Sequence, residues 1–231
     1  MVARVIAASP GRNVLDVGIG TGIAARQFQA AGCTVLGVDV DARMAEFARQ
    51  AGVGVEVATF EAWDPAGRTF DAVVSGQTWH WIDPVAGAAK AAEVLRPGGR
   101  LALFWNVSQP PPEVAAAFSA VHRQVMPGPL ADLAARPALE GYSVLFGRAG
   151  DGIRQSGAFL EPEQWRFDWE QLYTRDEWLD QLPTQGGYAQ LPPAVLAELR
   201  TGTGAAIDAA GGSFTTRYTA VVVTAARTSA G

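Results

Sequence analysis

Residues 14–22 read Val14, Leu15, Asp16, Val17, Gly18, Ile19, Gly20, Thr21 and Gly22. The first four are a mostly apolar run with the length of a short buried strand, and the alternate glycines allow a turn that side chains would prevent. Apolar side chains then recur at helical spacing over residues 23–31. This succession of strand, glycine turn and helix predicts a nucleotide-binding unit of an α/β protein.

An acidic residue, Asp39, closes the next apolar run, residues 34–40. If this run forms the neighbouring parallel strand, Asp39 lies at its carboxyl end. A carboxylate at that position accepts hydrogen bonds from both hydroxyl groups of a ribose. The turn and Asp39 together predict a ligand that contains adenosine.

The glycine spacing and Asp16 discriminate between adenosine ligands. A dinucleotide fingerprint has the form G-x-G-x-x-G, whereas the residue three places after Gly20 is Ile23. Asp16 would repel a diphosphate, but it suits a ligand that carries an ammonium group and a sulfonium. S-adenosylmethionine carries both groups, so we expect it as cofactor and S-adenosyl-L-homocysteine as product. A nicotinamide-dependent oxidoreductase is disfavoured.

Two later segments extend this pattern. Residues 70–77 resemble a fourth strand, and residues 95–104 resemble a helix end, a turn and a fifth strand. With residues 14–22 they resemble the class I S-adenosylmethionine-dependent methyltransferases over residues 2–108. Residues 78–83 are similar to the subgroup that includes trans-aconitate methyltransferase, whose members act on small molecules.

Apolar runs alternate with helical stretches, which predicts a parallel sheet covered by helices on both faces. Expected strands lie at residues 14–18, 34–40, 53–60, 70–76, 100–106, 164–173 and 213–228. Expected helices lie at residues 23–31, after the cap Asp41, from Asp83 to before Pro97, and at 113–125, 176–182 and 193–209. The resemblance implies a Rossmann-like, mostly parallel sheet of seven strands, with the last strand inserted antiparallel between its neighbours.

The segment from residue 110 to residue 160 is less regular. After the helix expected at 113–125 come Pro127, Gly128, Pro129 and a stretch dotted with glycines. Such a segment is typical of a cap over a site. We therefore expect a single methyltransferase domain over residues 1–231, in which residues 110–160 cap the substrate.

The amino-terminal end departs from the resembled pattern. The family usually has one or two helices before the first strand that cover the cofactor and substrate, whereas here residues 2–8 alone could do so. Two alternatives remain open: the true start lies upstream, or the pocket is unusually open. An open pocket would admit water near the sulfonium and lower both affinity and rate.

The loops that follow the strands should supply the site, because ligands of open α/β sheets bind beyond the carboxyl ends of the strands. The expected cofactor-binding residues are Asp16, Gly18, Ile19, Gly20, Asp39, Val40, Thr59, Phe60, Glu61, Gln77, Thr78 and Trp79. An aromatic face at Phe60 could stack on adenine. The resembled family often has an aspartate near Thr59, and Glu61 is a possible substitute here.

His80 is the expected catalytic residue. Methyl transfer is a direct in-line displacement, so a carboxylate acceptor needs only an arginine to orient it, whereas a hydroxyl acceptor benefits from a base such as His80. Arg148, Arg154 and Arg217 could meet a carboxylate. We expect methylation of an oxygen atom, or less favourably nitrogen, of a small organic molecule. A histidine that only bridges backbone groups is the alternative.

Four tryptophans, Trp63, Trp79, Trp81 and Trp105, follow the third, fourth and fifth strands. They could form an aromatic rim that steadies the sulfonium or encloses an apolar acceptor, since aromatic faces attract cations. Ordinary packing against the next helix is the other interpretation.

Composition limits the remaining classes. The net charge of -5 disfavours a nucleic-acid partner, and one cysteine with two histidines disfavours a metal site. No apolar stretch approaches the ~20 residues of a membrane span, and the sequence begins without a secretion signal, so we expect a cytoplasmic protein. The oligomeric state is left open. A cofactor-binding protein without transferase activity remains the alternative function.

Overall fold

The computed structural model describes residues 1–126, 138–184, 188 and 191–229. The chain divides into two compact units. The first comprises Met1–Asn106, Val144–Phe167 and Ala220–Gly231, and the second comprises Val107–Ser143 and Asp168–Thr219. The single domain that we expect over residues 1–231, with a substrate cap at 110–160, stays a prediction.

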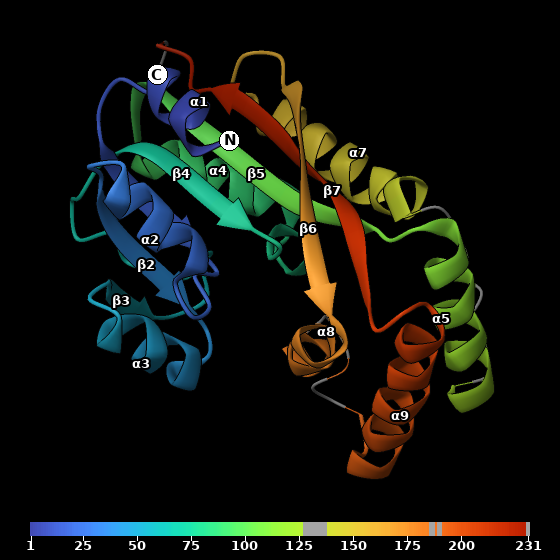
Figure 1. Cartoon of the computed structure of the whole chain (residues 1–231). Helices are drawn as coiled ribbons and strands as arrows, with labels where there is room; N and C mark the ends of the chain where they lie inside the picture. The colour runs from blue at the N-terminus through green and yellow to red at the C-terminus, as the bar shows by residue number, and fades with distance from the viewer. Residues whose placement is uncertain (127–137, 185–187, 189–190, 230–231) are drawn as a thin grey trace. The chain divides into compact units, whose positions relative to one another are not determined.

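One seven-stranded sheet has the order β3-β2-β1-β4-β5-β7-β6 (Figure 1). Its strands are β1 (Asn13–Val17), β2 (Thr34–Asp39), β3 (Gly54–Val57), β4 (Phe70–Gly76), β5 (Leu95–Gln109), β6 (Glu163–Thr174) and β7 (Ser213–Ala226). The pairs β1 with β2, β1 with β4, β2 with β3 and β4 with β5 are all parallel. This arrangement confirms the predicted Rossmann-like sheet.

Strand β7 runs antiparallel to β5. The backbone N–H of Gly98 donates to the carbonyl of Arg227, and the hydroxyl of Thr224 donates to the carbonyl of Leu101. Residue numbers therefore rise along β5 while they fall along β7. Because β7 lies between β5 and β6 in the sheet, the predicted antiparallel insertion of the last strand is confirmed.

The described helices are α1 (Val2–Ala7), α2 (Ile23–Ala30), α3 (Ala42–Gln50), α4 (Pro84–Val94), α5 (Pro112–Val125), α7 (Ala138–Ser156), α8 (Arg175–Gln181) and α9 (Pro193–Ala209), with short 3-10 helices η1 (Trp79–Trp81) and η2 (Leu182–Thr184). Asp41 and Asp83 begin α3 and α4 as predicted, because their carboxylates accept hydrogen bonds from the first backbone N–H groups of these helices. Pro84 occupies the first turn of α4, where it costs no hydrogen bond.

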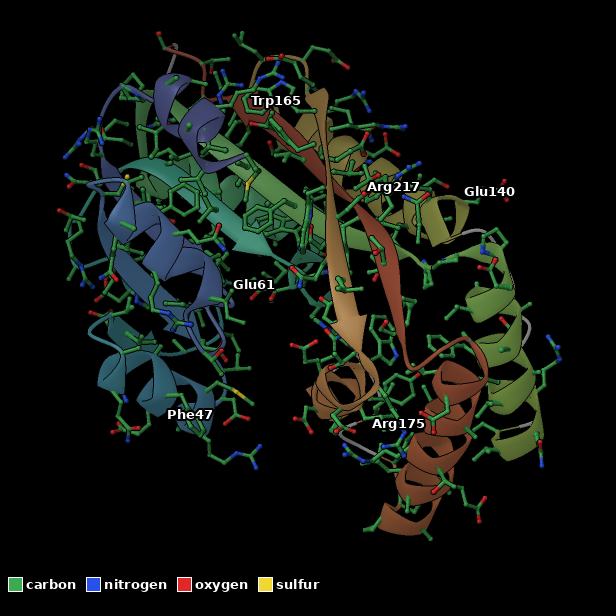
Figure 2. The ribbon with its side chains drawn as sticks, viewed as in Figure 1. Phe47, Glu61, Glu140, Trp165, Arg175 and Arg217 are labelled. Atoms are coloured by element: carbon green, nitrogen blue, oxygen red, sulfur yellow. The ribbon has the colours of Figure 1, made fainter. Side chains whose placement is uncertain are left out.

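Helices cover both faces of the sheet in the first unit. One apolar cluster joins Val5 of α1 and Phe28 of α2 to Val14 and Val74, which lie on one face of β1 and β4. On the same side Trp165 of β6 lies under α1, with the guanidinium of Arg4 at 4.1 Å from its ring centre (Figure 2). Helices α4 and α7 lie on the opposite face (Figure 1).

The second unit has its own apolar cluster. Val114 of α5, Trp178 of α8, Ile207 of α9 and Phe214 of β7 are buried against one another. The ring centres of Trp178 and Phe214 lie 5.0 Å apart in an edge-to-face arrangement. These contacts explain why the periodic apolar residues of the last third form helices that pack together.

The third strand is shorter than predicted. We expected residues 53–60, but β3 ends at Val57. The N–H of Ala58 still donates to the carbonyl of Asp39, after which the N–H of Ala62 donates to the carbonyl of Thr59 and closes a turn. Thr59 and Phe60 therefore belong to a loop.

Helix α7, of 19 residues, was not predicted, because its glycines indicated irregular structure. One of them has a packing role: a Cβ atom at Gly152 would lie 2.4 Å from the carbonyl oxygen of Pro84. The close approach of α7 to α4 therefore requires glycine at position 152. The packing of the two helices offsets the helix-propensity cost of glycine, about 1 kcal/mol. Pro127, Gly128 and Pro129 lie outside the described residues.

We predict that Gly152→Ala destabilises the chain by roughly 1–3 kcal/mol, because α7 must move away from α4. Gly147→Ala is the matched control on the same helix: no heavy atom lies within 4 Å of its added Cβ. It should be neutral or stabilise by up to about 1 kcal/mol through helix propensity. Urea unfolding of both variants measures this, and equal effects would contradict the packing argument.

Candidate functional site

The glycine turn after β1 is fixed to the end of β2. The N–H groups of Gly18 and Ile19 donate to the carbonyl of Val38 at 2.8 and 3.3 Å. Gly18 and Gly20 have φ angles of 67° and 56°, which favour glycine. No atom lies within 4 Å of where a Cβ of Gly20 would be. The turn is thus anchored on one side, and its backbone at Gly20 faces open space.

Asp39 is the last residue of β2, and its carboxylate holds the turn. Its Oδ2 accepts a hydrogen bond from the N–H of Gly20 at 2.7 Å, and its Oδ1 accepts one from the N–H of Asp41 at 2.9 Å. Each oxygen keeps a lone pair for a further donor. The next side chain, Val40, is 67% exposed. A fixed acceptor and an exposed apolar side chain therefore lie next to each other.

Asp16 lies in β1 just before the turn and is only 1% exposed. Burial, and secondarily the charge of Asp39, raise the pKa of Asp16 to about 7, although a hydrogen bond from the backbone of Ala25 opposes this. Its Oδ2 has no hydrogen-bond partner among the described residues. In the same part of the chain neither carboxylate has an ion pair. A cationic group of a ligand would supply the counter-charge that these two carboxylates lack.

The loop after β4 contacts the glycine turn. The hydroxyl of Thr78 lies within hydrogen-bond distance of the carbonyls of Gly18, at 3.2 Å, and Gly76, at 3.1 Å. A Cβ at Gly18 would lie 2.1 Å from Cγ2 of Thr78, so glycine is required there. Gln77 has a left-handed φ of 59°, and its amide donates to the carbonyl of Asn106. The structure therefore brings these two predicted loops together.

The residues after β3 are oriented differently from one another. Thr59 and Glu61 are exposed, whereas Phe60 is buried with its ring centre 6.2 Å from that of Trp79. Oε1 of Glu61 accepts a hydrogen bond from the N–H of Asp83 at 3.3 Å, which places Glu61 at the start of α4 (Figure 2). Phe60 packs inward in this structure, so the aromatic face that we expected for adenine is covered.

His80 lies in η1. Its Nδ1 is buried and has no hydrogen-bond partner among the described residues, and its ring centre lies 5.0 Å from that of Trp81. Burial lowers the pKa of His80. The imidazole is therefore neutral at pH 7 and able to accept a proton.

His80 also lines a small hollow, which we call the η1 hollow. Its lining residues are Trp79, His80, Ile82, Pro84, Trp105, Leu145, Arg148 and Ala149. The indole Nε1 atoms of Trp79 and Trp105 are buried and, among the described residues, have no partner. Trp105 and Arg148 were expected separately, and their place in the lining of one hollow was missed because α7 was not predicted.

The four tryptophans do not form one rim. Trp79 and Trp105 line the η1 hollow, whereas Trp63 is buried elsewhere with its Nε1 donating to Glu56 at 2.6 Å. Trp81 is 75% exposed. Two of the four tryptophans are therefore brought together.

The three candidate arginines also differ. Arg154 pairs with Asp151 and Glu161, and Arg217 of the second unit pairs with Glu170. Arg148 has no acidic partner within 4.0 Å in the part of the chain that the structure describes. Of the three, Arg148 alone has a guanidinium group without a counter-charge.

Neither a metal cluster nor a membrane-spanning helix is found in the described ranges. No group of three or more His, Cys, Asp or Glu side chains there is arranged to hold a metal ion. The described helices are all too short or too polar to cross a lipid bilayer.

Comparisons with known proteins agree with this architecture. Residues 15–103 match the family described as methyltransferase domain. An uncharacterized methyltransferase of Mycobacterium tuberculosis is 39% identical over 97 residues, which are 41% of this chain and 40% of that protein. Malonyl-[acyl-carrier protein] O-methyltransferase of Enterobacter lignolyticus is 32% identical over 155 residues, 62% of each chain. This chain thus spans less than two thirds of these relatives.

A solved structure is similar over almost the whole chain. A putative type II methyltransferase from Anaeromyxobacter dehalogenans has a TM-score of 0.62 at 23% identity, and the match covers 96% of this chain and 93% of that one. This likeness shows a shared fold.

The raised pKa of Asp16 predicts a specific pH dependence of stability. The folded chain binds the Asp16 proton more tightly than the unfolded chain, so this carboxyl group lowers the free energy of unfolding as pH rises from about 4 to about 7. Measured by unfolding in urea, the free energy of unfolding of the wild type should fall relative to that of Asp16→Asn as pH rises over this range, by on the order of 4 kcal/mol at most. A pH-independent difference would contradict the assignment.

Proposed function

Because residues 15–103 belong to the methyltransferase domain family, we propose that this chain transfers a methyl group from S-adenosylmethionine to an oxygen atom of a small organic acceptor. One observation carries the choice of cofactor: two carboxylates, Asp16 and Asp39, lie at an anchored glycine turn without a cation. The cofactor carries an ammonium group and a sulfonium, which supply the missing positive charge.

Each part of the turn has a role in this proposal. The free Oδ2 of Asp16 accepts a hydrogen bond from the ammonium group, and the backbone at Gly18, Ile19 and Gly20 faces the methionine part. Asp39 uses its remaining lone pairs for the ribose hydroxyls.

The adenine contacts are proposed from exposure. The exposed side chain of Val40 covers one face of the ring, and Thr59 and Glu61 meet its polar edge. Phe60 supports this side of the site from within through Trp79. Gln77, Thr78 and Trp79 border the position of the methyl group, since Thr78 contacts Gly18.

When bound, the cofactor would supply an activated methyl group for transfer to the acceptor oxygen, and it would leave as a neutral thioether. The chain must align the acceptor oxygen with the S–CH3 bond and exclude water. A carboxylate acceptor needs no proton transfer. For a hydroxyl acceptor, the neutral ring of His80 takes the proton that the oxygen loses.

The proposed acceptor is neither a nucleic acid nor a membrane lipid, and the proposed location is cytoplasmic. The net charge of -5 supports the exclusion of a nucleic acid, since its phosphates require a positive surface.

A cofactor-binding protein without transferase activity is the second candidate. The observation that favours it is Thr59, where the resembled family often has an aspartate for adenine recognition. Both candidate functions include binding of S-adenosylmethionine, but only the first includes transfer of its methyl group.

We predict that Asp39→Ala weakens S-adenosylhomocysteine binding by about 10-fold to 100-fold, because charge-assisted hydrogen bonds to the ribose are lost. Asp41→Ala is the matched control: Asp41 lies two residues later, and its side chain bonds Arg43. Titration calorimetry measures both affinities. The proposal fails if both variants keep the affinity of the wild-type chain, or if NADH raises the melting temperature and S-adenosylhomocysteine does not.

For His80→Ala we expect unchanged S-adenosylhomocysteine affinity and a fall in kcat of about 100-fold or more with hydroxyl acceptors. The same variant should keep most of its rate with carboxylate acceptors. A panel of small acids and phenols, with formation of S-adenosylhomocysteine as the readout, measures this. Cofactor binding without turnover on the whole panel would favour the second candidate.

A further inference from the structure

The polar groups of the η1 hollow are almost all hydrogen-bond donors. The indole N–H groups of Trp79 and Trp105 can only donate, and both are buried without a partner among the described residues. A buried N–H without an acceptor is unfavourable, and two of them on side chains that line the same hollow call for an explanation. The group that would satisfy them is an oxygen acceptor.

Charge selects among oxygen acceptors. Arg148 is exposed, lines the hollow and is the one charged side chain there, and no acidic side chain of the described ranges lies within 4.0 Å of it. Burial lowers the pKa of His80, so its ring adds no second charge at neutral pH. One positive charge matches a monoanion such as a carboxylate better than a phosphate dianion.

The remaining lining is apolar and the space is small. Ile82, Pro84, Leu145 and Ala149 complete the lining, and the hollow has room for about one water-sized group. Only one oxygen atom of a carboxylate can occupy this space, so the other oxygen and the hydrocarbon part must lie outside it.

Resting on the proposed function, we propose that the η1 hollow holds a carboxylate of the methyl acceptor, with the indole N–H groups of Trp79 and Trp105 and the guanidinium of Arg148 as donors. These residues come from η1, β5 and α7. The acceptor is then a small carboxylic acid. A single ordered water in the hollow is the alternative.

The test uses the full chain with S-adenosylhomocysteine present and follows the indole N–H resonances by NMR. The probes are phenylacetate and phenylacetamide, which have the same shape but differ in charge. We expect phenylacetate to shift the resonances of Trp79 and Trp105, assigned with Trp79→Phe and Trp105→Phe, and phenylacetamide to leave them in place. Equal shifts with both probes, or no shift with phenylacetate, overturn the proposal and leave a water as the occupant.

Arg148→Gln should weaken phenylacetate binding by about 10-fold or more, because the charged donor is lost. Arg154→Gln is the matched control on α7, since Arg154 already pairs with Asp151 and Glu161. It should leave phenylacetate binding unchanged. Equal affinities in the two variants contradict the role of Arg148.

The thermal shift with S-adenosylhomocysteine separates the two proposals. If the shift is present in the wild-type chain and in Arg148→Gln while phenylacetate fails to bind, the carboxylate subsite is wrong and the cofactor assignment stands. If the wild-type chain shows no shift with S-adenosylhomocysteine, the proposed function itself fails.

Discussion

The contact between the carboxylate of Asp39 and the N–H of Gly20 joins two neighbouring strands at the place where both end. It orients the glycine turn, and it also holds a negative charge near the buried carboxyl group of Asp16. Burial of Asp16, and secondarily the charge of Asp39, disfavour its ionised form, and the raised pKa of Asp16 reflects that cost. A positively charged ligand at this turn would stabilise the ionised form of Asp16 and relieve this unfavourable burial.

The glycine turn and the η1 hollow, both in the first unit, differ in the kind of polar atoms that lack a partner. Near the glycine turn the unpaired polar atom is Oδ2 of Asp16, whereas the side chains that line the η1 hollow carry two unpaired indole N–H groups, Nδ1 of His80 and the guanidinium of Arg148. Trp79 belongs to both regions, since it contacts Phe60 on one side and lines the hollow. An arrangement with acceptors for a cation and donors for an anion suits a reaction between a sulfonium and an oxygen nucleophile.

Much of the first unit could be predicted from local sequence. The apolar runs, the caps Asp41 and Asp83 and the position of Asp39 follow from neighbouring residues, and all of these appear in the structure. Helix α7 could not be predicted, because Gly152 is determined by its contact with Pro84, far away in the sequence. The inward packing of Phe60 and the presence of Trp105 and Arg148 in the lining of one hollow depend on such distant contacts too.

The most direct test of the account is the number of protons released when S-adenosylhomocysteine binds, measured by titration calorimetry in buffers of different ionisation enthalpy between pH 6 and 7. If the ammonium group pairs with Asp16, the wild-type chain must release a substantial fraction of a proton, because its pKa of about 7 falls on binding. Asp16→Asn should bind more weakly and release none. Tight binding by the wild-type chain without proton release would contradict the account.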